Sequence, residues 1–287
     1  MGTVFEIWIP EEGAEYAAQA AAAVFTEIDR LDRLFNRFDP SSEISRLGRL
    51  QPGERLPVGV EMVECLETAL ALREATAGAF AIDYATLVQY PEWNAAGSPG
   101  NRTLPPPGFV LERTPGGFAV FRKPGSDYPV RLDLGGIGKG LALDRCVEIL
   151  ADWSIESALL HGGTSTALGL GSGPKDASAR GWPVGFGESP GPLRRAFLRN
   201  RSLSGSGREV KGEHVTDPRR GEPAAGSASA WAAGVSAAES DALSTAFLVM
   251  SPEETERFCR SRPAVWARTV AFSGEDRIFN PDALETE

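Results

Sequence analysis

Four glycines and a lysine lie close together at residues 135–140 of this 287-residue chain, where a strand is predicted to turn into a helix. They belong to the segment Leu132-Asp133-Leu134-Gly135-Gly136-Ile137-Gly138-Lys139-Gly140-Leu141-Ala142-Leu143-Asp144. Glycines let backbone amides approach an anion closely, and the N-terminus of a helix favours negative charge. Lys139 is one of only four lysines among 29 basic residues. We therefore predict a phosphate-binding turn here, and a purely structural turn is the alternative.

Two known phosphate-binding motifs do not fit this segment. A P-loop has Ser or Thr after its lysine and a glycine at its start, and these places hold Gly140 and Asp133 here. The dinucleotide-binding fingerprint also fails, because its three glycines do not occur at the required spacing. Any phosphate site in this segment is therefore of another kind.

A second set of polar residues follows in Asp241-Ala242-Leu243-Ser244-Thr245. The spacing places the Asp241 carboxylate and the Thr245 hydroxyl on one face of the predicted helix, one turn apart. Mg²⁺ prefers oxygen ligands and usually completes its octahedral shell with waters and substrate phosphates. Asp241 and Thr245 are therefore candidate magnesium ligands. The alternative is that Asp241 acts only as a cap or dipole partner near the start of its helix.

The chain contains two histidines, His161 and His214. His214 lies in a polar loop ahead of Asp217-Pro218, which is typical of a turn. An imidazole titrates at about 6.5, so His214 is a candidate proton acceptor or orienting group, and an exposed loop histidine is the alternative. His161 precedes Gly162-Gly163, where a ligand can come close to the backbone, or it only hydrogen-bonds the backbone at the end of a strand.

Composition excludes several classes of function. With 42% hydrophobic and 24% charged residues the chain is an ordinary folded protein, and its net charge of −10 argues against a nucleic-acid partner. The three scattered cysteines are interpreted as small apolar core residues. No apolar run is long enough for a transmembrane segment. The first residues lack the features of a signal peptide, which predicts a cytoplasmic location, with an exported form whose leader has been removed left open.

Hydrophobic periodicity predicts a mixed order of helices and strands. Helices are expected at residues 14–38, 61–77, 139–152, 241–250 and 252–261, with a short one after Ser41-Ser42, and strands at 118–122, 129–134, 157–160, 231–237 and 264–272. Residues 91–116, 171–191 and 202–221 are rich in Pro, Gly or Ser and are expected to be loops. The order does not alternate strictly, which favours an α+β fold with mixed or antiparallel sheets flanked by helices.

These segments, in their order along the chain, resemble the ApbE family of FAD:protein FMN transferases. The similarity covers most of the chain, and the parts that carry it are Met1-Gly2-Thr3, residues 41–47, residues 132–144, Gly162-Gly163, Ser206-Gly207, residues 214–221 and residues 241–245. The resemblance implies a single catalytic unit over residues 1–287 with a central FAD cleft. Its two lobes would be a helical part, 1–100, and an α+β part, 101–287.

The resemblance also implies a site and a reaction. FMN would pass from FAD to a Thr or Ser hydroxyl of an acceptor protein, with release of AMP and with Mg²⁺ as cofactor. Mg²⁺ would be held by Asp241, Thr245 and the carbonyl of Gly138, and His214 would act on the acceptor hydroxyl. The flavin nucleotide would contact Gly135, Gly136, Lys139, Gly140, Asp144, Gly162, Gly163, Thr164 and Ser206.

The chain departs from the family pattern at a few places. Thr164 stands where an aspartate is usual, Leu160 where an asparagine is usual, and Ala81 where another aspartate is usual, with Asp83 nearby. Three alternatives therefore stay open: an FAD pyrophosphatase that releases FMN and AMP, a non-catalytic FAD-binding protein of the same fold, and a structural domain whose glycine segments are only turns.

Overall fold

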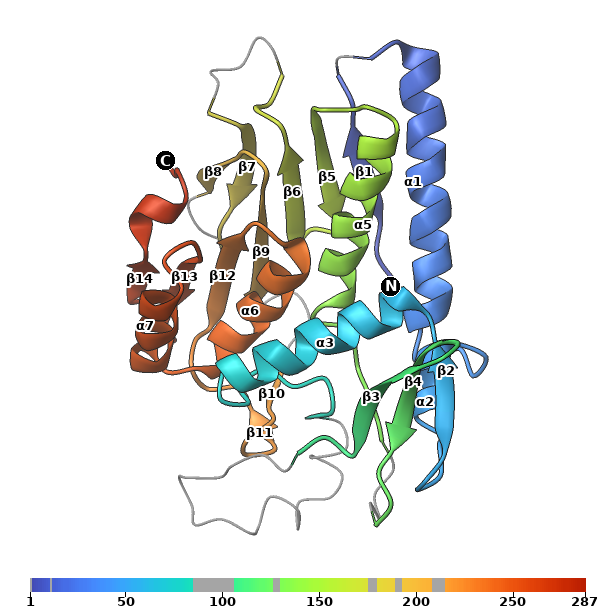
Figure 1. The fold of residues 1–287 in the computed structure, drawn as a ribbon. Helices are drawn as coiled ribbons and strands as arrows, with labels where there is room; N and C mark the ends of the chain where they lie inside the picture. The colour runs from blue at the N-terminus through green and yellow to red at the C-terminus, as the bar shows by residue number, and fades with distance from the viewer. Residues whose placement is uncertain are drawn as a thin grey trace.

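The computed structural model describes residues 2–10, 12–84, 106–125, 130–174, 180–188, 193–207 and 215–287. Helices and strands carry the labels of Figure 1. The helices are α1 (Ala14–Phe35), α2 (Glu43–Leu47), α3 (Val60–Ala75), α5 (Gly138–Asp152), α6 (Ala237–Val249), α7 (Pro252–Ser261) and the 3-10 turn Pro281–Ala283.

The strands form one large sheet and three small ones. The large sheet has the order β1-β5-β6-β9-β12-β13-β14, and the small sheets are β2-β4-β3, β7-β8 and β10-β11. All these pairs are antiparallel. The strand bounds are β1 (Phe5–Trp8), β2 (Arg55–Val58), β3 (Phe109–Thr114), β4 (Gly117–Arg122), β5 (Ala158–Gly162), β6 (Thr166–Leu170), β7 (Trp182–Phe186), β8 (Arg194–Leu198), β9 (Arg201–Gly207), β10 (Thr216–Asp217), β11 (Glu222–Pro223), β12 (Ser229–Gly234), β13 (Trp266–Val270) and β14 (Asp276–Phe279). The prediction of an α+β fold is confirmed.

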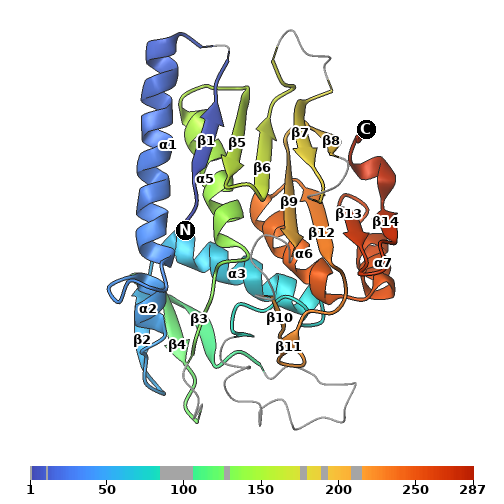
Figure 2. The same ribbon diagram turned by 180° about the vertical axis from the view of Figure 1, so that it is seen from behind.

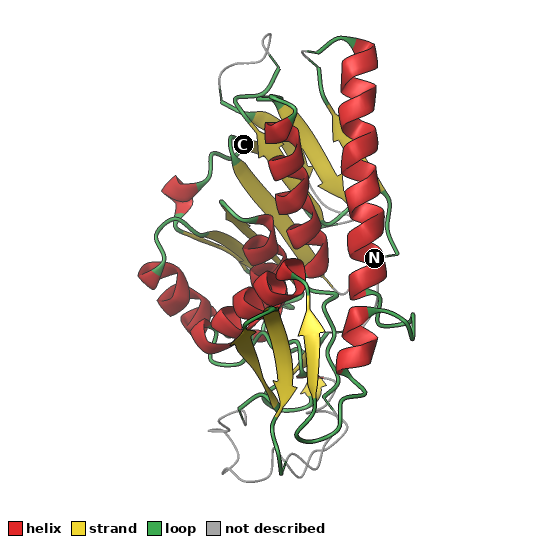
Figure 3. Ribbon diagram, turned by 45° about the vertical axis from the view of Figure 1, so that its right-hand side comes forward, coloured by secondary structure: helices red, strands yellow, loops and turns green. Residues whose placement is uncertain are grey.

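Helices α1, α5 and α6 cover one face of the large sheet (Figures 1 and 3). The inward face of α1 carries the periodic apolar side chains that predicted it, Val24, Ile28, Leu31 and Phe35. The helix ends at Phe35, three residues before its predicted end at residue 38, and Phe38 is 81% exposed. Helix α2 begins after Ser42, whose hydroxyl accepts a hydrogen bond from the Ser45 amide as predicted.

The hairpin β7-β8 covers part of the other face of the large sheet, over β6, β9 and β12 (Figure 2). A separate apolar cluster fills the space between them and includes Trp182, Phe186, Trp231 and Trp266. Apolar clusters therefore lie on both faces of the large sheet, one set against the helices and the other under this hairpin.

Several expected loops contain strands. Residues 171–191 hold β7, residues 202–221 hold most of β9, and residues 91–116 hold β3. Conversely, the described residues 130–134 of the expected strand 129–134 form no strand, and residue 129 lies outside the described residues. In β9 the signal is weak because small residues replace the apolar ones: Ser202 and Ser204 are fully buried, facing α6.

The expected lobe boundary at residue 100 lies outside the described residues. Strand pairing crosses it, because β1 pairs with β5 and β2 pairs with β4. The N-terminal part is therefore built into both the large sheet and the small one, and it supplies β1 and β2 as well as helices. The division into two lobes stays a prediction.

Candidate functional site

A buried ion pair joins the two segments that the sequence singled out. Lys139 Nζ on α5 lies 3.0 Å from Asp241 Oδ1 and 3.2 Å from Asp241 Oδ2 on α6. The Asp241 side chain is 4% exposed and that of Lys139 is 17% exposed. The same ammonium lies 3.4 Å from the carbonyl oxygen of Gly135. Lys139 and Asp241, which are 102 positions apart in the sequence, thus belong to one cluster of polar groups.

Neutral donors surround the rest of the Asp241 carboxylate. The Gly140 amide donates to Oδ2 at 3.2 Å, and the hydroxyls of Ser204 and Thr166 lie 3.3 and 3.4 Å from Oδ1. These donors come from the first turn of α5 and from strands β9 and β6. Sequence analysis did not find Ser204 or Thr166, since isolated hydroxyls in strands carry no recognisable spacing. They hold the carboxylate in one orientation.

Helix α6 begins earlier than the sequence predicted. It starts at Ala237, and the Ser236 hydroxyl caps it by accepting a hydrogen bond from the Glu239 amide. Asp241 is therefore in the second turn, and the alternative that it caps its own helix is wrong. Its carboxylate instead lies at the N-terminal end of α5, where the unpaired amides of a helix favour an anion.

Thr245 lies one turn beyond Asp241, beside the glycine-rich segment. A Cβ added at Gly136 would lie 3.3 Å from Thr245 Oγ1, which is a tight contact, so glycine keeps the space beside this hydroxyl open. Ser206 lies next to the same hydroxyl, with an oxygen–oxygen distance of 3.4 Å, and closer to Ser244, at 2.9 Å. Gly138, the third predicted ligand residue, is the first residue of α5, between Gly136 and the Gly140 amide.

Asp133 holds the first residues of the glycine-rich segment in place by hydrogen bonding. Its Oδ1 accepts a hydrogen bond from the Gly135 amide at 2.9 Å, and its Oδ2 accepts from the Tyr84 hydroxyl and pairs with Arg37, both at 2.8 Å. Burial and the neighbouring Asp133 carboxylate raise the pKa of Tyr84 to about 12, so this hydroxyl stays a donor. Arg37 and Tyr84 were not predicted, because their link to the glycines exists only in the folded chain.

Comparison with known proteins identifies the family. The model of the ApbE family matches residues 1–268. The chain belongs to the ApbE family. A curated relative, the FAD:protein FMN transferase of Treponema pallidum (strain Nichols), is 33% identical over 155 residues, which cover 47% of this chain. The aligned region spans only 42% of that relative's length.

Solved structures of the ApbE family share the fold. The flavin transferase ApbE from Vibrio cholerae matches with a TM-score of 0.76 and 18% identity, over 97% of this chain and 94% of its own. The Pseudomonas stutzeri flavinyl transferase ApbE, apo form, has a TM-score of 0.75, 19% identity and coverages of 97% and 92%. The ApbE protein of Thermotoga maritima has a TM-score of 0.75, 24% identity and coverages of 98% and 95%.

The second glycine pair forms the turn between β5 and β6. Gly163 has a φ of +69°, a conformation that favours glycine, and a Cβ there would overlap the Thr3 hydroxyl. Gly162 lies close to the aliphatic part of Lys139, since an added Cβ would be 3.6 Å from Lys139 Cβ. Thr164 is exposed in this turn. The turn is therefore a neighbour of the ion pair, and its contact with a nucleotide stays a prediction.

His161 packs edge-on against Trp8, with ring centroids 5.6 Å apart. Burial lowers the pKa of His161, so the neutral ring is favoured. This packing accounts for the histidine without a ligand. His214, the residue expected to act on an acceptor hydroxyl, lies outside the described residues.

Asp144, expected to contact the flavin nucleotide, has a structural role in this fold. Its carboxylate accepts hydrogen bonds from the Ala237 amide at 2.8 Å, the Ala238 amide at 2.9 Å and the Ser236 hydroxyl at 2.8 Å. Burial raises the pKa of Asp144, and these donors offset only part of the effect. The carboxylate thus joins α5 to the start of α6, which explains the residue without a nucleotide.

Replacing Asp144 by Ala should destabilise the fold. Two amides of the first turn of α6 and one hydroxyl would lose their acceptor in a mostly buried place, at a cost of about 2–4 kcal/mol in the free energy of unfolding. Urea denaturation followed by circular dichroism measures this loss. The control is Asp152→Ala at the exposed end of the same helix, which should stay within about 0.5 kcal/mol of wild type. Equal stability of the two variants would contradict the role given to Asp144.

The donor set at Asp241 suits a hard cation. One carboxylate and one hydroxyl on α6, beside a glycine-rich turn, are oxygen groups of the kind Mg²⁺ selects, and a positive group already lies against the carboxylate. Within the described residues, no three side chains of His, Cys, Asp or Glu gather as a metal site. A metal here would therefore need oxygen atoms from the backbone, from water and from a substrate.

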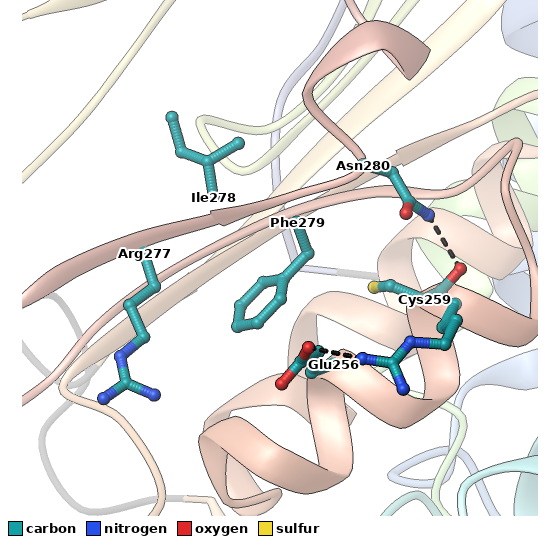
Figure 4. Close-up of a pocket in the computed structure, with 7 residues that line it drawn as sticks. Glu256, Cys259, Arg277, Ile278, Phe279 and Asn280 are labelled. Carbon is teal, nitrogen blue, oxygen red and sulfur yellow. Dashed lines mark hydrogen bonds and ion pairs between the residues drawn. The ribbon is translucent and has the colours of Figure 1, made fainter.

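A cavity of the described chain lies away from the Lys139–Asp241 pair. It measures about 490 Å³ and is lined by residues of α7 and β14 (Figure 4). Its polar groups already have partners: Asn280 donates to the carbonyl of Cys259 at 2.8 Å, and Arg260 pairs with Glu256 at 2.6 Å. Asn280 closes the C-terminal end of α7, so these residues have a structural explanation.

Two further predictions concern cysteines and membranes. Cys65, Cys146 and Cys259 are buried and unpaired, and burial raises the pKa of each to about 12, so the interpretation as core residues is confirmed. Among the described helices, none combines the length and the apolar character required to cross a bilayer.

Proposed function

We propose that this protein is a Mg²⁺-dependent FAD:protein FMN transferase, which moves FMN from FAD to a Thr or Ser hydroxyl of an acceptor protein and releases AMP. Family membership and the name of the Treponema relative support the reaction class. The observation that carries the proposal in this chain is the convergence of Lys139, the α5 N-terminus and Asp241 on one point. Together they offer positive charge and backbone donors to a pyrophosphate and a carboxylate to a cation.

The reaction is a displacement at phosphorus. The acceptor hydroxyl oxygen forms a bond to the phosphorus of the FMN half, the bond from that phosphorus to the bridging oxygen breaks, and AMP leaves with that oxygen. Lys139 and the amides of the glycine-rich segment would bind the phosphate oxygens and hold them in line with the nucleophile. His214 is proposed to take the hydroxyl proton.

Asp241, Thr245 and the carbonyl of Gly138 would hold Mg²⁺. The ion, when bound, neutralises the negative charge that grows on the pyrophosphate oxygens. Ser204 and Thr166 keep the Asp241 carboxylate oriented, since both hydroxyls lie within 3.4 Å of Oδ1. Asp133 holds the Gly135 amide in place, so the glycine-rich turn is preorganised before a substrate arrives.

The proposal is tested by incubating the protein with FAD, Mg²⁺ and a panel of bacterial flavoprotein subunits. Transfer adds the mass of FMN less one water to an acceptor, and AMP appears in equal amount. AMP and FMN released in the absence of any acceptor would instead identify a pyrophosphatase. Intact FAD in every reaction, with FAD bound, would identify a non-catalytic binding protein and would contradict the proposal.

Phe38 is proposed to contribute to binding of FAD. It is an exposed aromatic ring, and the neighbouring Arg37 both lies over it, at 4.8 Å, and pairs with Asp133 of the glycine-rich segment. An exposed ring in this place can stack on a planar ligand group. Phe38→Ala should weaken FAD binding about tenfold, measured by quenching of flavin fluorescence.

The control for Phe38 is Phe272→Ala, which removes another exposed ring, 56% accessible, after β13. It should leave FAD affinity within a factor of about two of wild type. Equal affinities of the two variants would contradict a role for Phe38 in the site.

We further propose that residues 1–287 form a single catalytic unit. We also propose that the protein acts in the cytoplasm. Limited proteolysis tests the first, because one unit should resist cleavage into separately folded halves. Cell fractionation tests the second.

A further inference from the structure

We infer that Lys139 is a resident counter-ion of Asp241, which must leave the carboxylate before a divalent cation binds there, and that it leaves by moving to the pyrophosphate. Lys139 thereby makes binding of the nucleotide a condition for tight binding of the metal. This inference rests on the proposed function, since it assumes that Asp241 is a metal ligand.

Lys139 occupies the place on Asp241 that a metal ion would need. Lys139 Nζ contacts both oxygens of Asp241, at 3.0 and 3.2 Å, so the ammonium lies across the carboxylate. A cation on the carboxylate would meet this ammonium at close range, where like charges repel strongly because the pair is largely removed from water. The two positive groups therefore compete for one carboxylate.

Lys139 is the one charged group among the described donors to the Asp241 carboxylate. Within the described part of the chain, the other donors to the Asp241 carboxylate are neutral: the Gly140 amide and the hydroxyls of Ser204 and Thr166. They can stay in place when a metal binds, because a carboxylate accepts more than one contact per oxygen. Only Lys139 has to move.

The Lys139 side chain is able to move away from Asp241. Its remaining contact, at 3.4 Å to the Gly135 carbonyl, is long, and the side chain is 17% exposed whereas Asp241 is 4% exposed. The lysine stem is flexible and its ammonium is a compact charge. It lies in the first turn of α5, next to the amides proposed to bind the pyrophosphate. A short rotation would exchange Asp241 for a phosphate oxygen.

Coupling follows from this exchange. The nucleotide draws the ammonium away and frees the carboxylate, and the metal repels the ammonium toward the nucleotide. Each ligand therefore raises the affinity for the other by the same factor, as linkage requires. The alternative is a permanent ion pair that only stabilises the contact between α5 and α6.

The experiment measures Mn²⁺ affinity by electron paramagnetic resonance of the free ion, without and with FAD. In nucleotide-free protein, Lys139→Met should bind Mn²⁺ at least about tenfold more tightly than wild type. FAD should raise the Mn²⁺ affinity of wild type at least about tenfold and that of Lys139→Met by a clearly smaller factor. Lys139→Gln, which keeps a hydrogen-bond donor, is the second variant in case the Met variant does not fold.

Lys123→Met is the matched control, because it removes the same charge from a lysine after β4. It should bind Mn²⁺ like wild type, which excludes an effect of net charge alone. Adding Asp241→Asn to the Lys139 variant should abolish the tight binding.

Two outcomes distinguish failure of the Lys139 exchange from failure of the proposed function. Unchanged or weaker Mn²⁺ binding by the nucleotide-free Lys139 variants, with Asp241-dependent binding in the presence of FAD, overturns the inference and leaves the proposed function standing. Mn²⁺ binding that never depends on Asp241 overturns both.

Discussion

Replacing Asp241 by Asn should lower the rate of AMP release from FAD about 1,000-fold or more, while the protein stays folded. The substitution removes the negative charge and keeps the shape of the side chain. An Asn oxygen in the place of Oδ2 can still accept from the Gly140 amide, and the Ser204 hydroxyl can rotate to accept from the NH2 group in the place of Oδ1. Loss of the anchor for a cation that stabilises the transition state by several kcal/mol gives a factor of this size. Chromatography of AMP, with and without an acceptor, measures the rate.

The matched control is Asp152→Asn, at the exposed C-terminal end of α5. It changes the charge by the same amount and should keep the wild-type rate. Thermal unfolding followed by circular dichroism establishes that both variants are folded. An Asp241→Asn enzyme that retains a tenth of the activity would rule out the role proposed for this carboxylate.

Replacing Gly140 by Ala should destabilise the protein by about 3 kcal/mol or more. Helices α5 and α6 approach so closely here that an added Cβ would overlap the carbonyl group of Ala237 and would lie 2.6 Å from the Ala238 amide nitrogen. These are backbone atoms, which cannot rotate away as a side chain does. The helices would have to separate, and the Gly140 amide would then also leave Asp241. Urea denaturation measures the loss of stability.

Gly138→Ala serves as the comparison for stability, because Gly138 is in the same turn of α5. The nearest atom to a Cβ there is Leu134 Cβ at 3.9 Å, an ordinary contact. Alanine is also the better helix former, so this variant should equal wild type or exceed it by up to about 1 kcal/mol. If Gly140→Ala is as stable as Gly138→Ala, the helices are not packed as described.

Helices were predicted more reliably than strands, for physical reasons. The apolar side chains of α1 recur every turn, and α7 begins with Ser251 and Glu254, which form a capping box. Strand β9 has no such pattern. Its serines are buried because the small side chains let α6 lie close to the sheet, and that choice of residue depends on the partner helix.

In the site, too, local patterns were predictable and contacts between distant segments were not. Residue types and local spacing singled out Lys139, Asp241 and Thr245 as candidate groups. Neither segment, taken alone, indicates that it lies against the other. The family resemblance implies that Asp144 contacts the nucleotide, and that contact stays a prediction. In the fold, the partners of Asp144 are Ser236 and the first amides of α6. A carboxylate that caps a neighbouring helix cannot be told from a ligand contact by its position in the chain.

The amino-acid sequence shows which elements can form and which side chains carry charge, since periodicity, capping and residue chemistry are local properties. Which carboxylate meets which cation follows from the folded chain, because the packing of α5 against α6 brings Asp241 and Lys139 together. That packing depends on an absent side chain at Gly140 and on hydroxyls from strands far apart in the sequence. Each of these contacts depends on two segments at once, so neither segment alone predicts it.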